Sequence, residues 1–543
     1  MMKFRFPAFV AVVACCISCV EINGELGSNL LPKDQNYKIF IEERPIDEID
    51  LKMCDSLSGY SQTQVVVGAI RDAEGRLSTR SSAMTLVPLR RTMDFGKNPK
   101  FKSFHLAIAS DTVSMDDSRY AHIIQGVKVF ELEKALSPLR NFDCNAKISH
   151  KGNSIVKNSP ILNGIDSLRL EFTEEYGKRF FELTSEDLND FEKYTEKIPG
   201  IYLETDTPIG TGGRINALEL QLDYNTDMMA LQGNYASLNF SSEYDGAVKD
   251  TSFLFYLGAT DIVNGDSLVL HTSSGAYYNQ YALNLTGEES VRAREGKAQE
   301  DIFICGGGGI KPRISAQWLR KAVAEMIAQK GGNPKTAIIN KASLILPFEF
   351  PEDYLEMGKY PKVLSPTTRI LTDTTATFVS LTDASDETEN IGEVNRSLLC
   401  YSPDFTYHMQ TILTLDDDDE DLLKGSYDIW LLVMDYYTVA TDNSSEELSQ
   451  YYQQLAYQSY YNNMYGGYGG YGGYGGGYGY GYDSYTNYYN YMMMAQYAAN
   501  NVSTNSTLML DISKYYRAYL CGPQAADPDK RPKLKVTFSI PEK

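Results

Sequence analysis

The sequence predicts a mainly β protein with two β-sandwich domains, a few short helices and one low-complexity insertion. Short apolar runs recur between turn residues, and several alternate with polar residues, as Val127 and Val129 do with Lys128. The chain has 543 residues, which is longer than one hydrophobic core usually serves. We therefore expect one β-rich domain at residues 36–230 and a second at 231–543, both jelly-roll-like.

Apolar runs with strand character occur in both halves of the chain. They are Tyr37–Glu42, Gln64–Ala69, Phe104–Ala109, Gly126–Leu132, Ser167–Thr173, Gly200–Leu203, Ile215–Tyr224, Ala236–Ser241, Thr251–Leu257, Asp266–His271, Ala337–Phe350 (as a pair), Gln410–Leu415, Tyr427–Tyr437, Ser506–Asp511 and Lys533–Ile540. The acidic run Asp416–Asp421 lies between two of these expected strands, so we expect it at a hairpin tip. A calcium loop would need a glycine at its sixth position and a glutamate at its twelfth, and the sequence has neither there.

Two segments have helix signals. Thr184 or Ser185 precedes a short acidic turn, which is typical of a capped helix start. Residues 315–330 place Trp318, Leu319 and Val323 on one face and end at Gly331-Gly332. The glycines of Cys305–Ile310 lack the lysine and hydroxyl of a phosphate loop, so we expect a tight chain reversal there.

The N-terminus has the pattern of a lipoprotein signal peptide at residues 1–18. Lys3 and Arg5 precede an apolar run that is too short for a membrane-spanning helix, and small residues and cysteines follow it. We expect lipidation of Cys19, with Cys15 as the alternative and an ordinary cleaved signal as the other possibility. Acyl chains such as palmitate on Cys19 would attach the chain to a membrane through a tether at residues 19–35.

Composition restricts the partners and the redox chemistry. Removal of Lys3 and Arg5 with the signal leaves 48 basic against 71 acidic residues, a net charge of −23. So acidic a chain disfavours nucleic acid and anionic headgroups as partners. The cysteines after Cys19 are Cys54, Cys144, Cys305, Cys400 and Cys521. They contain no CxxC spacing, and we expect several to be buried apolar side chains.

Residues 441–502 differ from the rest of the chain. Tyrosine and glycine dominate them, with a Tyr-Gly-Gly repeat, which predicts a disordered insertion. Its tyrosines are either a tolerated surface feature or a contact element for glycans or a partner protein. The candidate contact residues are Tyr465, Tyr468, Tyr471, Tyr474 and Tyr478.

No catalytic or metal-binding motif stands out. The five histidines fall in no HExxH or HxH pattern, and the chain has no GxSxG elbow. A carboxylate pair for glycoside cleavage cannot be recognised among 71 acidic residues. We therefore expect no enzyme activity, no metal and no cofactor.

The order of segments resembles domain-of-unknown-function family 4270, the outer-membrane lipoproteins of Bacteroidetes-type Gram-negative bacteria. The resemblance rests on ELGSNLLP after the cysteine, GVKVFELEKAL, PGIYLETDTPIGTGGRINALEL, GGGGIKPRI, AIINKASLILPFEF and RPKLKVTFSI. It implies a large, mainly β envelope lipoprotein without an assigned catalytic site. The tyrosine–glycine insertion and the acidic run depart from the family pattern.

The sequence thus predicts a non-catalytic outer-membrane lipoprotein that is an accessory or scaffold for another envelope protein, such as an outer-membrane β-barrel. The alternative is a glycan-binding lipoprotein, and a third class is an envelope hydrolase. Val-Glu-Ile-Asn follows Cys19 in place of an acidic run, so the periplasmic and cell-surface faces both stay open.

Overall fold

The computed structural model describes residues 36–542 with several gaps. The gaps are residues 55–56, 62–63, 73–74, 89–93, 112–122, 137–141, 221, 226–229, 258–262, 265–267, 270–281, 288–298, 352–356, 359, 372–375, 386–388, 439–505 and 512–513. Strands dominate the described residues, their pairings are antiparallel, and the helices are few and mostly short. The predicted fold class is therefore confirmed.

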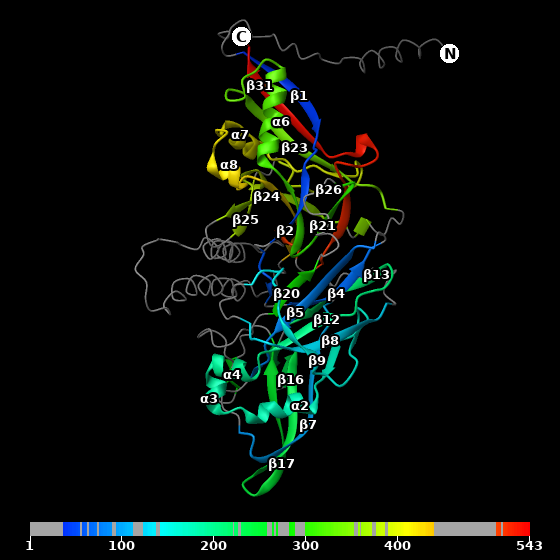
Figure 1. The fold of residues 1–543 in the computed structure, drawn as a ribbon, viewed down its shortest axis with the longest axis vertical. Coiled ribbons are helices and arrows are strands. Elements are labelled where there is room, and N and C mark those ends of the chain that lie inside the picture. Colours follow the sequence, from blue (N-terminus) through cyan, green and yellow to red (C-terminus); the bar gives the residue numbers. More distant parts are fainter. Residues whose placement is uncertain are drawn as a thin grey trace, which may run out of the picture.

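The described chain forms two lobes, and the molecule is elongated (Figure 1). The terminal lobe contains both described ends of the chain, at residues 36–54 and 299–542. The insert lobe lies between them in sequence, at residues 57–287, and its β16–β17 hairpin is at the far end of the molecule (Figure 1).

Two facing sheets enclose the core of the insert lobe. A nine-stranded sheet has the order β10-β8-β12-β5-β20-β3, with β4, β9 and β13 joined to it, and the other sheet has the order β11-β7-β16-β17-β6. Alternate residues of both sheets point inward, such as Val127 and Val129 from one sheet and Phe104 and Phe255 from the other. The helices α2, α3 and α4 add Tyr176 and further apolar side chains to this core.

The elements of the insert lobe have the following bounds. They are β3 (Tyr60–Ser61), β4 (Gln64–Arg71), β5 (Leu77–Met84), β6 (Val87–Pro88), β7 (Lys97–Ile108), β8 (Gln125–Leu132), β9 (His150–Ser154), β10 (Ile161–Leu162), β11 (Leu168–Glu171), α2 (Glu174–Arg179), η4 (Phe180–Glu182), α3 (Ser185–Asn189), α4 (Phe191–Lys197), β12 (Ile201–Thr205), β13 (Gly212–Glu219), β14 (Leu222–Asn225), β15 (Ala230–Gly233), β16 (Tyr235–Tyr244), β17 (Ala247–Tyr256), β18 (Val263–Asn264), β19 (Leu268–Val269) and β20 (Ala282–Gly287).

The terminal lobe packs helices and sheets around a second core. One sheet has the order β1-β31-β23-β27-β26, another has the order β2-β22-β28-β24-β25 with β29 on β28, and β21 pairs with β30. Helix α6 buries Leu319, Val323 and Ile327 in this core, where inward residues of the sheets such as Phe538 and Leu431 also lie. The amphipathic face of α6 thus covers one side of the β1-β31-β23 sheet.

The elements of the terminal lobe have the following bounds. They are β1 (Tyr37–Pro45), β2 (Ile49–Cys54), β21 (Asp301–Cys305), β22 (Gly309–Ile314), α6 (Ala316–Gln329), β23 (Ile338–Pro347), β24 (Val363–Leu371), β25 (Ala376–Ser380), η6 (Thr382–Ser385), β26 (Val394–Asn395), β27 (Cys400–Tyr401), α7 (Thr406–Thr414), α8 (Glu420–Lys424), β28 (Ile429–Thr438), β29 (Ser506–Leu510), β30 (Arg517–Cys521), η7 (Pro528–Lys530) and β31 (Lys533–Pro541).

The two cores divide the chain differently from the predicted boundary at residue 230. Strands β1 and β2 pair with β31 and β22 of the terminal lobe, whereas β16, β17 and β20 belong to the insert lobe. The physical reason is that strand pairing depends on which surfaces meet in space. An alternating pattern predicts a strand but does not say which strand pairs with it.

Both predicted helices are confirmed. Ser315 caps α6 by accepting a hydrogen bond from the backbone N–H of Trp318 at 3.4 Å. Thr184 and Asp187 form a reciprocal capping box at the start of α3, as the acidic turn indicated. The glycines after Cys305 form the expected reversal between β21 and β22.

Three local predictions are wrong. Residues 410–414 of the segment expected as a strand lie in helix α7, and Leu415 is its C-cap; Met409, Ile412 and Leu413 are buried together at helical spacing. The acidic run is therefore not a hairpin tip. Residues 416–419 connect α7 to α8, and Glu420 and Asp421 form the first turn of α8. Asp419 caps this helix by accepting a hydrogen bond from Leu422 N–H at 2.9 Å. Residues 337–350, expected as two strands, contain the single strand β23 (Ile338–Pro347).

Candidate functional site: the junction between the lobes

The histidines that the structure describes include two with well-defined contacts. His408 is buried and makes a 2.9 Å hydrogen bond to the carbonyl of Tyr427, and burial lowers its pKa. His150 stacks between the rings of Phe130 and Tyr202. In this described part, no group of three or more histidine, cysteine or acidic side chains could hold a metal ion.

One pair of carboxyl groups does come together. Glu389 hydrogen bonds to Asp404, and burial followed by this neighbour raises the pKa of Glu389. Asp404 also accepts hydrogen bonds from Ser343 and from Asn390 N–H, and it pairs with Lys341 at 3.0 Å. Glycoside cleavage needs carboxyl groups about 5 Å or more apart, so that the sugar or a water fits between them. Glu389 and Asp404 are hydrogen-bonded to each other, so this pair does not meet that requirement.

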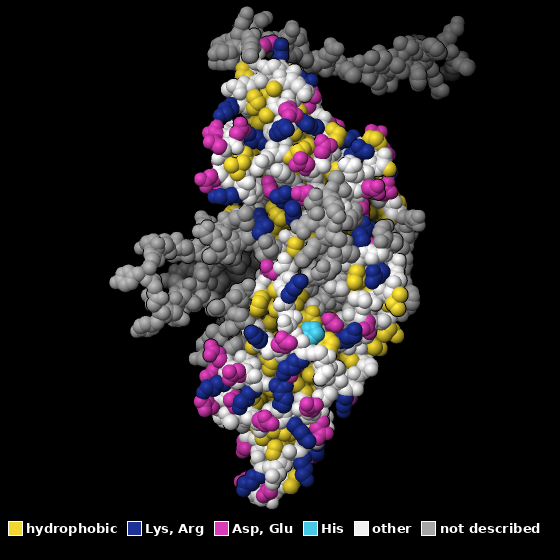
Figure 2. Space-filling model, in the orientation of Figure 1, with side chains coloured by type: hydrophobic (Ala, Val, Ile, Leu, Met, Phe, Trp, Pro, Cys, Tyr) yellow, Lys and Arg dark blue, Asp and Glu magenta, His cyan; other side chains and the backbone are white. Residues whose placement is uncertain are grey.

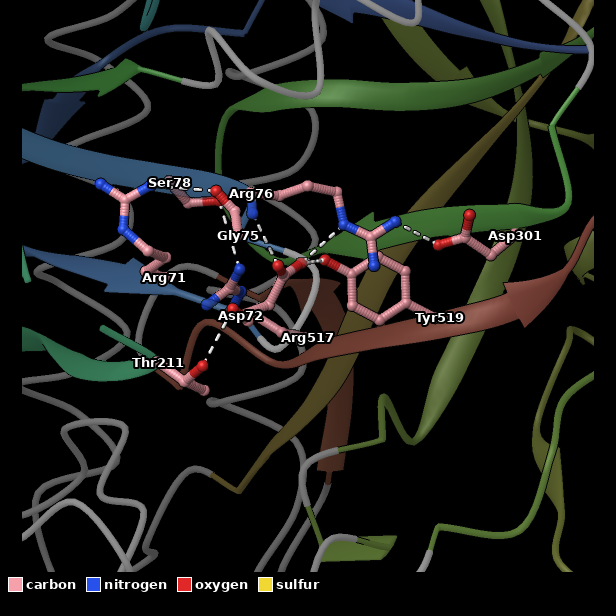
Figure 3. A network of polar contacts seen from close by, with 9 residues as sticks. All are labelled: Arg71, Asp72, Gly75, Arg76, Ser78, Thr211, Asp301, Arg517 and Tyr519. Atoms are coloured by element: carbon pink, nitrogen blue, oxygen red, sulfur yellow. Dashed lines mark hydrogen bonds and ion pairs between the residues drawn. The ribbon is translucent and has the colours of Figure 1, made fainter. Parts of the chain in front are cut away.

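A network of polar contacts lies between the lobes, and we define it as the junction. Its insert-lobe side is the β4–β5 hairpin, and its terminal-lobe side is the β21–β30 ribbon (Figure 3). The hairpin turn forms because Asp72 N–H donates to the carbonyl of Arg76 at 3.0 Å and Gly75 adopts a φ of +79°. This positive φ favours glycine.

Arg76 and Asp72 occupy the middle of the junction. The Asp72 carboxylate accepts hydrogen bonds from the backbone N–H and the Nε of Arg76, both at 2.7 Å. It also accepts one from the Tyr519 hydroxyl of β30, while Arg76 forms an ion pair with Asp301 of β21. The Arg76 guanidinium lies 4.0 Å from the centre of the Tyr519 ring. Cation–π contact thus adds to the ion pairs across the lobes.

The ionisation of these groups follows from their contacts. Burial alone would raise the pKa of Asp72, but the hydrogen bonds from Tyr519 and Arg76 outweigh it and hold the pKa below its ordinary value. Burial raises the pKa of the Tyr519 hydroxyl, which therefore stays protonated and able to donate. The middle of the junction is thus a satisfied set of paired charges at neutral pH.

Flanking residues extend the same network. The Arg71 guanidinium donates to the carbonyls of Pro208 and Gly75, both at 2.9 Å. Thr211 donates to the carbonyl of Asp72 at 3.4 Å, and Arg517 of β30 donates to the Ser78 hydroxyl of β5 at 3.2 Å (Figure 3). The bond between Arg517 and Ser78 is a further link between the lobes.

The tetraglycine turn Gly306–Gly309 also belongs to the junction. A Cβ on Gly307, whose φ is +66°, would collide with the Tyr515 ring, and one on Gly308 would collide with the Cys144 sulfur of the insert lobe. The glycines therefore allow the backbone of the terminal lobe to approach side chains that a larger residue would push away.

A buried lysine lies beside this turn. Lys311 of β22 is completely buried and donates to the carbonyl of Cys305, and burial lowers its pKa. Arg80 of the insert lobe contacts the Cys305 sulfur at 3.3 Å. Cys144 contacts the carbonyl of Cys54 at 3.7 Å, and burial raises the pKa of its thiol to about 12. Protonated thiols of this kind are poor nucleophiles and poor metal ligands.

The five cysteines of the described chain are all buried and unbridged, in agreement with the expectation of buried apolar cysteines. The predicted lipidation residue Cys19, its alternative Cys15 and the tyrosines at 465, 468, 471, 474 and 478 lie outside the described residues. The structure therefore brings none of the predicted site residues together, and they stay predictions.

Sequence reasoning missed the junction. The Asp72-x-x-Gly75 spacing is a turn signal, but nothing in it indicates a contact with Asp301 or with Tyr519. The tetraglycine run predicts a reversal, but no signal in the sequence indicates its contacts with the other lobe.

The junction and the lobes define a mainly β protein whose two lobes are joined by paired charges. No family model, curated protein or solved structure matches the chain. Among the helices that the structure describes, none has the length and apolar character to cross a membrane.

Proposed function

We propose that this protein is a lipid-anchored outer-membrane protein without catalytic activity that supports another envelope protein as an accessory or scaffold. The junction is the observation that supports this proposal most. Arg76 pairs with carboxylates from both lobes, and these side chains are mostly buried, with exposures of 11% for Arg76, 12% for Asp72 and 29% for Asp301. Such a junction favours one fixed arrangement of an elongated body, which a scaffold needs.

The position of the chain ends also supports the proposal. The first described strand, β1, begins directly after the predicted tether, at the end of the molecule opposite the β16–β17 hairpin (Figure 1). An acyl group on Cys19 would hold the terminal lobe at the membrane and leave the insert lobe to extend from it.

The test is a tagged purification of the full chain from gently solubilised outer membrane, with mass spectrometry of the acyl group and of the co-purifying proteins. We expect an acylated protein and a stoichiometric partner, such as a β-barrel. The matched control is the variant with Cys15→Ser and Cys19→Ser, which should lose both the acyl group and the partner. Recovery of the acylated protein alone would contradict the scaffold role.

Glycan binding stays the alternative from the sequence. It depends on the tyrosine-rich residues 441–502, which lie outside the described part, so no structural observation favours it. Its test is retention of the full chain on outer-membrane polysaccharides, with a variant that lacks residues 441–502 as the control.

A further inference from the structure

The β1-β31-β23 sheet has one covered face and one open face. Phe40, Phe538 and Ile339 lie on the covered face, which packs toward α6. The open face displays Tyr37, Ile39 and Ile41 of β1 and Ile338 of β23. Ile39 and Ile41 are 67% and 64% exposed, which is unusual for large apolar side chains that are neighbours on one strand face.

The register places these residues in rows across the sheet. Ile39 and Ile338 both lie opposite Ser539 of β31, and the next row contains Ile41, Thr537 and Lys341. One row further from the chain ends, Glu43 pairs with Lys535 at 3.0 Å. The open face thus changes from apolar to charged along the strands, and Tyr37 lies at its outer border. We call Tyr37, Ile39, Ile41 and Ile338 the apolar patch.

The described charges on the open face beside the apolar patch are paired. Lys341, in the row of Ile41, forms an ion pair with Asp404 at 3.0 Å. On the opposite face of β1, Lys38 forms an ion pair with Glu542 at 2.9 Å. Hydrophobic side chains are visible among charged ones at this end of the molecule (Figure 2). An apolar surface with a balanced charged border suits the boundary between uncharged lipid headgroups and acyl chains, where tyrosine is also enriched.

The chain outside the structure limits what can lie against the apolar patch. Tyr37 is only two residues beyond the predicted tether, and the residues from 20 to 35 can span at most about 55 Å between the lipidated Cys19 and the sheet. The patch is therefore always within reach of the bilayer to which the chain is attached. A side chain at the far end, such as Val248 of the β16–β17 hairpin, has no such link.

We propose that the apolar patch lies in the interface of the bilayer that holds the lipid anchor. This contact orients the terminal lobe against the membrane and points the insert lobe away from it. The inference rests on the proposed lipid anchor and adds a second membrane contact. The occupant is a zwitterionic lipid surface, because the acidic chain disfavours anionic headgroups.

The experiment places an environment-sensitive dye on the full-length protein, purified with its acyl group and reconstituted into protein-free phosphatidylethanolamine–phosphatidylcholine vesicles. Ile41→Cys carries the dye in the patch, and Val248→Cys, at a side chain that is 76% exposed, is the matched control. The five described cysteines are buried, so wild-type protein gives the background labelling. Both substitutions replace exposed side chains and leave the cores intact.

We expect the dye at position 41 to shift to the blue, to gain intensity several-fold and to be quenched by brominated lipid. The dye at position 248 should behave as in water. Equal, water-like signals at the two positions of an acylated, vesicle-bound protein would overturn the patch proposal and leave the lipid anchor standing. A blue shift at position 41 in native outer membrane but not in vesicles would also overturn it, because the occupant would then be a protein. Absence of the acyl group in the mass spectrum would refute the proposed function itself and, with it, the patch proposal.

Discussion

Replacement of Arg76 with methionine should uncouple the two lobes. Arg76 is the residue that pairs with both Asp72 of the insert lobe and Asp301 of the terminal lobe. Methionine keeps most of the apolar volume but removes the charge, so two carboxylates lose their partner. Removal of one member of a buried ion pair costs about 3–5 kcal/mol. We expect about 3 kcal/mol here, because Asp301 is partly exposed and Asp72 keeps the Tyr519 hydroxyl.

The two tryptophans make this uncoupling measurable. Trp318 and Trp430 are the only tryptophans of the chain, and both lie in the terminal lobe. Tryptophan fluorescence therefore follows the unfolding of one lobe in urea, whereas far-ultraviolet circular dichroism follows the strands of both. We expect the two unfolding curves to coincide in the wild type and to separate in Arg76→Met.

Two further variants calibrate the effect. Tyr519→Phe removes only the hydroxyl that donates to Asp72, so a loss of about 1.5–3 kcal/mol is expected, as for a hydrogen bond to a charged group. Lys102→Met breaks an exposed pair with Asp250 and should cost less than about 1 kcal/mol. If Arg76→Met shifts the midpoint no more than Lys102→Met does, and the two curves still coincide, the reasoning about the junction is refuted.

The junction also predicts acid sensitivity. The pKa of Asp72 in the folded protein lies below its ordinary value, so the unfolded state binds the proton more readily. The stabilisation is therefore complete above about pH 4 and is lost as the pH falls through the folded pKa. In acid, the urea unfolding curves from tryptophan fluorescence and from circular dichroism should therefore separate in the wild type as well.

The remaining predictions concern buried groups. Lys311→Met should leave stability unchanged or raise it. Because the pKa of Lys311 is lowered from 10.5 in the folded protein, wild-type stability should rise as the pH increases toward 10.5, and the substitution should weaken this rise, as measured by urea unfolding at a series of pH values. The five described cysteines should react with a thiol reagent only after unfolding, because they are buried and the pKa of Cys144 is raised to about 12; fast labelling of the native protein would contradict this. Gly213→Ala should destabilise the protein by about 1–3 kcal/mol, because Gly213 has a φ of +102° and a Cβ there would collide with the Ala69 carbonyl. Its control Gly210→Ala, where a Cβ would meet open space, should change stability by less than about 0.5 kcal/mol, and similar effects of the two would refute the argument.

Local patterns in the sequence were sufficient for many elements. The period of Leu319, Val323 and Ile327 predicts α6, and the alternation in residues 533–540 predicts β31, because each pattern records one face that must be buried. Residues 410–415 show the limit of this reasoning. Their short apolar run is compatible with a strand or with a buried helix turn. In the folded protein the segment packs as a helix against α6 and β23.

By itself, the sequence determined the mainly β class, the caps at Ser315 and Thr184 and the reversal at Gly306–Gly309. Only the tertiary structure decided that β1 pairs with β31, at the other end of the chain, and that the insert lobe interrupts the terminal lobe. It also decided that Arg76 meets Asp301, 225 residues further along the chain. The physical reason is that a strand or a turn is specified by neighbouring residues, whereas a lobe and its junction arise from surfaces that meet only after the chain has folded.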